Sequence, residues 1–108
     1  MSTTDRAGGP PKTAGSPASE ATVVLRIAAG DPSALGELYD RLAPRIHLLA
    51  RSVCGDVGVA EDITYEVFLE LWRLADRIDP GTDGAAAWLL TATHRRALDA
   101  VRSGRSRG

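Results

Sequence analysis

Residues 33–53 of this chain read SALGELYDRLAPRIHLLARSV, and this stretch decides the fold class. Its large apolar side chains recur at intervals of three and four residues, which places them along one face of an α-helix. These residues are Leu35, Leu38, Tyr39, Leu42, Ile46, Leu49 and Val53. Pro44 interrupts the pattern and removes one helical hydrogen bond, so we expect either a kink or a split of the helix there.

A shorter helix is predicted before this stretch, over residues 20–29. Its apolar side chains are followed by Gly30, a residue that favours the end of a helix. Asp31 and Pro32 then form a start signal for the next helix, with Asp as the N-cap and Pro at the first helical position.

Two further helices are predicted after it. Asp56 is expected to cap a helix that reaches Leu74, and the last helix covers residues 85–102. Between them, residues 79–84 read DPGTDG, a run of turn-forming residues that predicts a loop. The expected inner faces are Ala60, Ile63, Val67, Phe68 and Leu71 on the first of these helices and Leu90, Ala97 and Val101, with Leu98 beside them, on the second. Four helical segments without a strand pattern predict an all-α fold, a compact bundle of three to four helices.

The length and composition of the chain set further limits. The 108 residues suffice for one domain, which we expect over residues 20–102. Residues 1–19 are rich in Ser, Thr, Gly, Pro and Ala and predict a disordered arm, whereas residues 103–108 have the composition of a linker. No apolar run is long enough to cross a bilayer and no signal peptide is visible, so we expect a cytoplasmic protein.

Few residues suggest catalysis or metal binding. Cys54 is the single cysteine, which excludes an internal disulfide, and we expect it to be a small buried side chain near a helix end. His47 and His94 are too few and too far apart to bind a metal with it. There is no phosphate-binding loop and no nucleophile elbow, so we predict no enzyme activity, no catalytic residue, no cofactor, no metal site and no small-molecule substrate.

The charges are divided unevenly along the chain. Residues 56–83 hold eight acidic residues against two arginines, a net charge of −6, and residues 84–108 hold five arginines against Asp99, a net charge of +4. This division suggests two surfaces with partners of opposite charge. The alternative is that both segments form solvated faces without a charged partner and that their net charges balance each other in the compact fold.

The acidic segment carries an ordered stripe of carboxylates. Asp62, Glu66 and Glu70 follow one another at intervals of four residues, where like charges destabilise a helix by roughly 0.2–0.5 kcal/mol per pair. Only Arg73 lies close enough in the sequence to relieve them. We interpret the stripe as a surface for a basic partner. The alternatives are a soluble outer face whose acids favour the helix dipole and, as a weak signal, carboxylates that act as an acid–base pair or as metal ligands.

Tyr65, Leu69 and Trp72 form a second apolar strip on the same helix. Part of this strip is expected to complete the core. Any part that stays exposed would extend the partner surface, because aromatic side chains beside charges often anchor interfaces.

The last helix carries the arginines. Trp88, Thr91, Arg95 and Arg102 share one face, which can follow phosphates and stack on unpaired bases. Asp99 can pair with Arg95 at i+4 and weaken this surface. Arginine near a helix C-terminus also has a purely structural benefit, so DNA binding is one of two interpretations.

In this order, the motifs resemble domain 2 of the extracytoplasmic-function (ECF) sigma factors of the sigma-70 family. GDP at residues 30–32, LY at 38–39 and APR at 43–45 are similar to the opening of that domain. AEDI at 60–63, EVFL at 66–69 and LWR at 71–73 resemble its region 2.2. DP at 79–80, AWLL at 87–90 and RRALD at 95–99 resemble regions 2.3 and 2.4. The resemblance covers residues 20–102.

This resemblance implies specific partners. The acidic helix would bind the coiled coil of the RNA polymerase β′ subunit through Asp62, Glu66, Leu69, Glu70 and Arg73. The loop from Asp79 to Ala87, with Thr82 and Asp83, would receive a base flipped from the non-template strand of the promoter −10 element. Trp88, Thr91, Arg95, Arg96 and Arg102 would hold the opened strand. Members of the family are commonly inhibited by an anti-sigma factor that covers these surfaces.

Two departures from the family accompany this resemblance. Tyr65 stands where the family usually carries Gln, and the sequence stops where the family continues into a second domain that reads the −35 element. The sequence therefore leaves open a domain fragment or a natural truncation. It also leaves open a truncated sigma-like protein that binds polymerase or an anti-sigma factor without opening DNA. A helix-turn-helix repressor fits less well, because the Pro-Gly loop is long for that turn.

Overall fold

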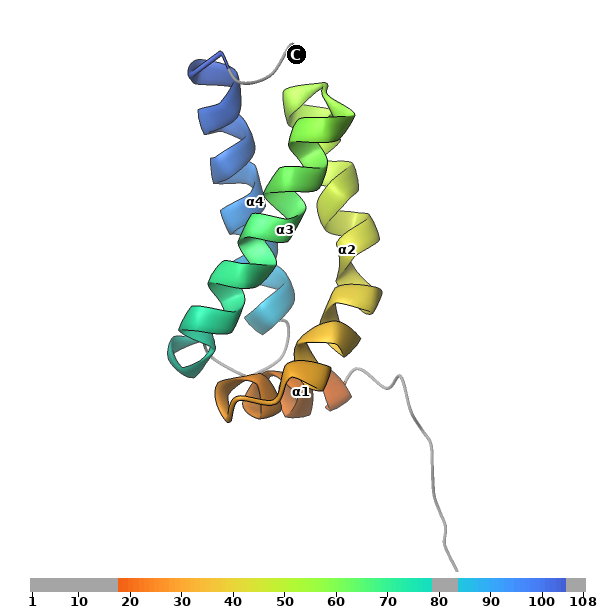
Figure 1. Ribbon diagram of the computed structural model, residues 1–108, viewed down its shortest axis with the longest axis vertical. Helices are drawn as coiled ribbons and strands as arrows, with labels where there is room; N and C mark the ends of the chain where they lie inside the picture. Colours follow the sequence, from red (N-terminus) through yellow and green to blue (C-terminus); the bar gives the residue numbers. More distant parts are fainter. Residues whose placement is uncertain (1–17, 79–83, 105–108) are drawn as a thin grey trace, which may run out of the picture.

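The computed structural model describes residues 18–78 and 84–104, and in these residues the chain is helical without a β-strand. The elements are α1 (Ala18–Ala28), α2 (Pro32–Cys54), α3 (Val57–Leu74), the short 3₁₀-helix η2 (Ala75–Arg77) and α4 (Gly84–Arg102). In Figure 1, α2, α3 and α4 run lengthwise beside one another, and α1 lies across one end of them. The prediction of an all-α bundle of three to four helices is confirmed.

The expected helix boundaries agree closely with those observed. The first helix begins at Ala18, two residues before the predicted start, and Gly30 follows it in the left-handed region at φ 90°. Asp31 caps α2 by accepting hydrogen bonds from the Ser33 backbone N–H at 3.0 Å and the Ser33 hydroxyl at 2.7 Å. Pro32 occupies the first turn, as predicted. The expected arm lies outside the described residues except for Ala18 and Ser19, which belong to α1.

Helix α2 continues through Pro44 without a break, so the predicted alternative of two separate helices is wrong. Pro44 is exposed, and the carbonyl of Asp40 that loses its helical donor belongs to another exposed residue. On the opposite side, Leu42 and Ile46 are buried and attach both halves of the helix to the same core. Packing therefore outweighs the loss of one hydrogen bond on the solvent side.

The turn between α2 and α3 has its own caps. Gly55 adopts φ 71° and its N–H donates to the Arg51 carbonyl at 2.8 Å, which ends α2. Asp56 then accepts from the Val59 N–H at 3.0 Å, which confirms it as the N-cap of α3. Cys54 is fully buried at this junction, also as predicted.

The core lies between α2, α3 and α4 and is closed at one end by α1. The inner face predicted for α3 is buried in full, together with Thr64. The inner face predicted for α4 is wrong in part: Ala97 is buried and Leu90 packs against the core, but Val101 is 39% exposed. The buried residues of α4 are Ala85, Leu89, Ala92, Thr93, Ala97 and Ala100. Small side chains on this face are easily overlooked beside larger neighbours.

An ion-pair network connects α1 to the start of α2. Arg26 on α1 contacts Asp31 at 3.0 Å and Glu37 at 2.8 Å. Hydrogen bonds from Ser33 and Arg26 lower the pKa of the Asp31 carboxyl, and those to Glu37 and Asp31 raise the pKa of Arg26. This network fixes the tight turn around Gly30.

The lowered pKa of Asp31 predicts a loss of stability in acid. Because the folded chain holds this proton less tightly than the unfolded chain, the stabilisation is present above the usual pKa of 3.8 and is lost as the pH falls below it. In Asp31→Asn, the amide still caps α2 but the charge facing Arg26 is gone. We expect this variant to have a lower melting temperature than the wild type at neutral pH and to approach the wild type in acid, at a pH below the lowered pKa of Asp31. Thermal unfolding followed by circular dichroism at both pH values measures it, and an equal difference at the two would contradict the prediction.

Candidate functional site

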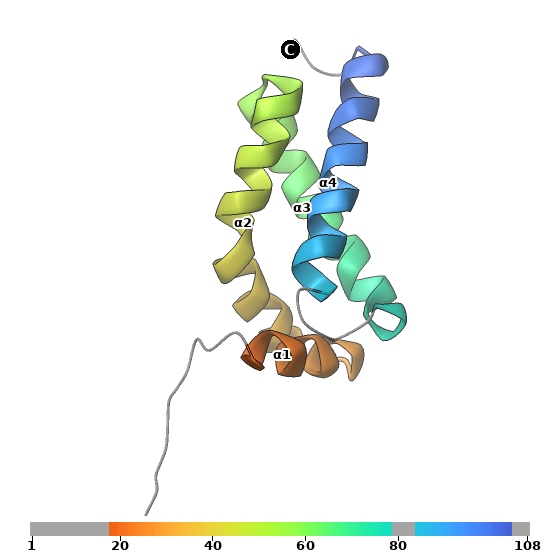
Figure 2. The ribbon, with the colours of Figure 1, turned by 180° about the vertical axis from the view of Figure 1, so that it is seen from behind.

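The acidic stripe of Asp62, Glu66 and Glu70 lies on α3 at the edge that faces α4. Asp62 is exposed, and the Glu66 and Glu70 side chains are 37% and 27% exposed. Arg96 of α4 reaches both glutamates, with its guanidinium nitrogens 3.4 Å from Glu66 Oε1 and 2.9 Å from Glu70 Oε1. Seen from behind, α4 passes in front of α3 (Figure 2).

The role of Arg96 as the partner of these glutamates could not be predicted from residues nearby in the sequence. The sequence offered Arg73 as the only relief for the stripe, but Arg96 lies 30 and 26 residues from its two partners. Partly exposed ion pairs contribute about 0.2–1 kcal/mol each, similar in size to the repulsion expected along the stripe. Arg96 thus largely offsets the cost of placing Glu66 and Glu70 one turn apart.

The second apolar strip of α3 divides between core and surface, as expected. Trp72 packs against the core, whereas Tyr65 is 61% exposed and Leu69 is 42% exposed. Arg73 is exposed one turn beyond Leu69. The predicted polymerase-binding residues therefore all lie on the solvent side of α3, although Glu66 and Glu70 are only partly accessible.

An apolar groove lies beside Tyr65 and Leu69, between α2 and α3. It encloses about 420 Å³ and is lined by Pro32, Leu35, Gly36, Tyr39, Tyr65, Phe68 and Leu69. Among these residues, the rings of Tyr39 and Phe68 pack against each other with centroids 4.8 Å apart. The sequence analysis did not find this groove, because it placed Tyr39 on the buried face of its helix. The structure leaves 39% of Tyr39 exposed.

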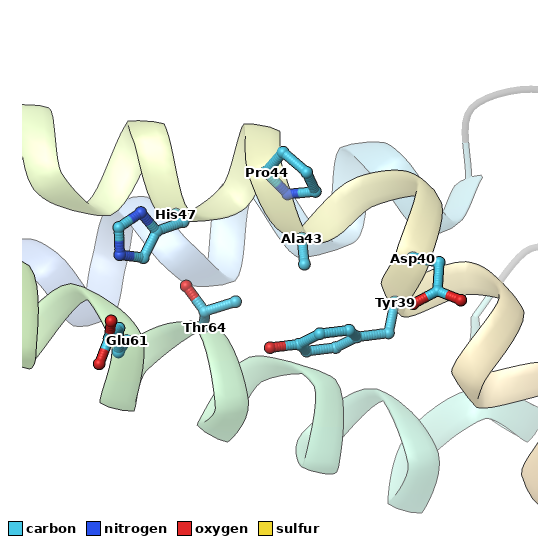
Figure 3. A pocket seen from close by; sticks show the side chains of 7 residues that line it. All are labelled: Tyr39, Asp40, Ala43, Pro44, His47, Glu61 and Thr64. Carbon is cyan, nitrogen blue, oxygen red and sulfur yellow. The ribbon is translucent and has the colours of Figure 1, made fainter.

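A polar hollow of about 630 Å³ continues the groove along the two helices, with Tyr39 common to both (Figure 3). The other residues that line it are Asp40, Ala43, Pro44, His47, Glu61 and Thr64. His47 and Glu61 face one another from α2 and α3 at one end, and Asp40 lies at the other. His47 Nε2 is buried and accepts or donates no hydrogen bond within the described residues.

The arginine face of α4, formed by Trp88, Thr91, Arg95 and Arg102, is only partly exposed. Thr91, Arg95 and Arg102 are accessible to solvent, and Trp88 packs its ring against the core. Asp99 pairs with Arg102 at 3.2 Å and not with Arg95, which corrects the expected i+4 pair. Both spacings bring side chains together on a helix, and the i+3 pair lies at the C-terminal end. Arg95 has no ion pair with another described residue.

Two parts of the predicted DNA-binding set remain: Arg96 and the loop residues Asp79, Thr82 and Asp83. Arg96 is turned toward α3, and its side chain is 34% exposed. Asp79, Thr82 and Asp83 lie outside the described residues, so the predicted base pocket stays a prediction. The two surfaces that the sequence treated as separate meet at Arg96.

Comparison with known proteins identifies the family. The sequence matches the family described as Sigma-70 region 2 over residues 38–107. It is 42% identical over 95 residues to the ECF RNA polymerase sigma factor SigK of Mycobacterium tuberculosis strain H37Rv and to that of Mycobacterium bovis BCG Pasteur, covering 87% of this chain and 49% of each relative. The SigK protein of Mycobacterium sp. strain KMS is 43% identical over 82 residues, 75% of this chain and 42% of the relative.

The chain thus spans about half the length of the curated relatives it matches. In the described residues, no helix is both long enough and apolar enough to span a membrane. The matched region begins in α2 and includes the acidic stripe, the α3 side of the groove with Tyr39, and all of α4. The chain belongs to the Sigma-70 region 2 family.

Proposed function

We propose that this chain is the polymerase-docking and −10-capturing part of an ECF-type RNA polymerase sigma factor. The observation that carries the proposal is the juxtaposition, on one small bundle, of an acidic stripe beside an apolar groove on α3 and an exposed arginine face on α4. The family match and the similarity to SigK proteins support it. The chain would act in the cytoplasm, without catalysing a reaction.

The groove and the stripe suit an amphipathic, basic helical partner, which we propose is the coiled coil of the polymerase β′ subunit. Tyr65 and Leu69 can anchor apolar side chains from the partner, and Asp62, next to them on α3, can attract its cations. Tyr65 replaces a residue that is usually Gln in the family, so the groove would gain apolar contact where other members make a polar one. An anti-sigma factor would compete for the same surface.

The arginine face of α4 suits a single strand. Arg95 and Arg102 can bind successive phosphates, and the exposed edge of Trp88 can stack on an unpaired base. The chain would open the −10 element by capturing the non-template strand, so that pocket and phosphate contacts offset the few kcal/mol needed to unstack a base. The loop containing Asp79, Thr82 and Asp83 would receive that base.

A second candidate is a sigma-like interaction module that binds polymerase or an anti-sigma factor without opening DNA. One observation favours it: in the free chain, Arg96 is occupied by α3 and Trp88 packs against the core, which reduces the surface left for nucleic acid. Direct DNA binding distinguishes the two candidates.

The test compares a single-stranded −10 non-template oligonucleotide with the same sequence as a duplex. We expect tighter binding of the single strand. Arg95→Gln should weaken it and reduce the slope of log K against log salt by about 0.7, the value for one lost phosphate contact on a single strand. The matched control is Arg51→Gln, which removes one exposed arginine from the end of α2.

Fluorescence anisotropy over a range of salt concentrations measures both affinity and slope. Equal effects of the two substitutions would contradict the assignment of Arg95. A preference for duplex would indicate a double-strand reader, and no binding of either form would favour the interaction module.

A further inference from the structure

Arg96 joins two residues of the acidic stripe to α4 by ion pairs. Its guanidinium lies 3.4 Å from Glu66 and 2.9 Å from Glu70, and all three side chains are between 27% and 37% exposed. A partly exposed ion pair of this kind is accessible to competing charges from outside. Both carboxylates are therefore shared between an internal cation and any basic partner that approaches α3.

A guanidinium held by Glu66 and Glu70 is turned toward α3 and its charge is largely neutralised there, so it is less available to a phosphate on α4. We propose that Arg96 is a coupling residue: in the free chain it occupies Glu66 and Glu70, and a basic partner that takes over these carboxylates releases it to a nucleic-acid strand on α4. This inference rests on the proposed function, and it adds a regulatory role to one residue of that surface.

The release requires a side-chain rotation but no movement of α4. Leu89 and Ala97 are fully buried and hold the helix in the core, independently of the ion pairs at its edge. The released guanidinium would then lie on the helix that carries Arg95, which is already exposed. The acidic partner surface and the nucleic-acid surface thus exchange one cation without a change of fold.

Thermodynamic linkage gives the coupling a sign and a size. If the basic partner strengthens binding of the strand, the strand must strengthen binding of the partner by the same factor. Because two partly exposed ion pairs are exchanged, we expect a factor of about five in each direction. In the chain without a partner, Arg96 should contribute little to binding of a strand.

The first test removes the carboxylates without adding a partner. Glu66→Gln with Glu70→Gln should bind the single-stranded −10 oligonucleotide about fivefold more tightly than Glu61→Gln with Asp76→Asn, which removes the same two charges from α3 and η2 without an ion pair to Arg96. The salt slope should rise by about 0.7, one additional phosphate contact. With Arg96→Gln also present, the advantage over the control should disappear.

The second test reads the reciprocal effect without DNA. Arg96→Gln should bind the isolated β′ coiled coil about fivefold more tightly than the wild type, because the internal competitor for Glu66 and Glu70 is gone. Arg95→Gln is the matched control, a loss of the same charge from the neighbouring position on α4. Circular dichroism of every variant verifies that the bundle is intact.

The outcomes separate this inference from the proposed function. If the wild type binds the oligonucleotide and the coiled coil, but both pairs of variants behave like their controls, Arg96 does not couple the surfaces and the proposed function stands. An advantage that persists with Arg96→Gln would also overturn the coupling. If no variant binds the oligonucleotide, with or without the coiled coil, the coupling and the DNA-binding half of the proposed function both fall.

Discussion

Leu71→Ala is expected to lower the free energy of unfolding by about 3 kcal/mol, a large part of the stability of a domain this small. Leu71 is fully buried on the inner face of α3. Truncation removes apolar surface from the core and leaves a cavity that the neighbouring helices can fill only in part. Denaturation by urea followed by circular dichroism measures the change.

The matched control is Leu48→Ala, the same chemical change at a side chain that is 66% exposed on α2. We expect it to alter stability by no more than about 0.5 kcal/mol. Similar losses in the two variants would mean that the core does not lie where α3 faces α2 and α4. Because Leu71 is buried and not part of the exposed surface, Leu71→Ala should keep its binding partners wherever the chain remains folded.

Reversal of the charge at Asp62 is expected to weaken binding of the polymerase β′ coiled coil about 30-fold. Asp62 is exposed on the acidic stripe, so a lysine there presents a positive charge that repels a basic partner. Placing like charges opposite one another in an interface costs roughly 2 kcal/mol or more, which corresponds to a factor of this size. Calorimetric titration with the isolated coiled coil provides the measurement.

Reversal at Glu66 would break its ion pair with Arg96, whose role is tested separately. The control is Asp76→Lys, the same reversal at an exposed residue of η2 outside the stripe. High salt should reduce the difference between the two variants, since screening acts on exposed charges. Equal loss of binding in both would indicate a general effect of net charge, and no loss in either would exclude the stripe as the docking surface.

Much of the secondary structure could be predicted from local sequence. Gly30, Asp31, Pro32 and Asp56 act at the helix ends where their backbone and side-chain chemistry suggests. The five apolar residues predicted for the inner face of α3 are all buried, because they repeat with the period of a helix, whereas the buried Thr64 was missed. Local chemistry decides these features, so neighbours in the sequence are sufficient to find them.

Which face of α4 is buried was harder to predict from the sequence. Its buried face consists largely of alanines, which allow close approach to α2 and α3 but carry a weak hydrophobic signal. Val101, chosen for its size, is on the surface instead. The hydrophobic pattern of a helix identifies its buried face reliably only when the large residues are the buried ones.

The sequence by itself determined the helices, their caps, the acidic stripe on α3 and the arginines on α4. Only the tertiary structure decided which of these charges meet and where the surface is hollow. Arg96 pairs with Glu66 and Glu70 because α4 packs against α3 in one orientation, and Tyr39 borders a groove because α2 and α3 diverge beside it. Ion pairs and grooves between helices depend on distances across the bundle, which are set by the packing of the whole core and not by any one segment.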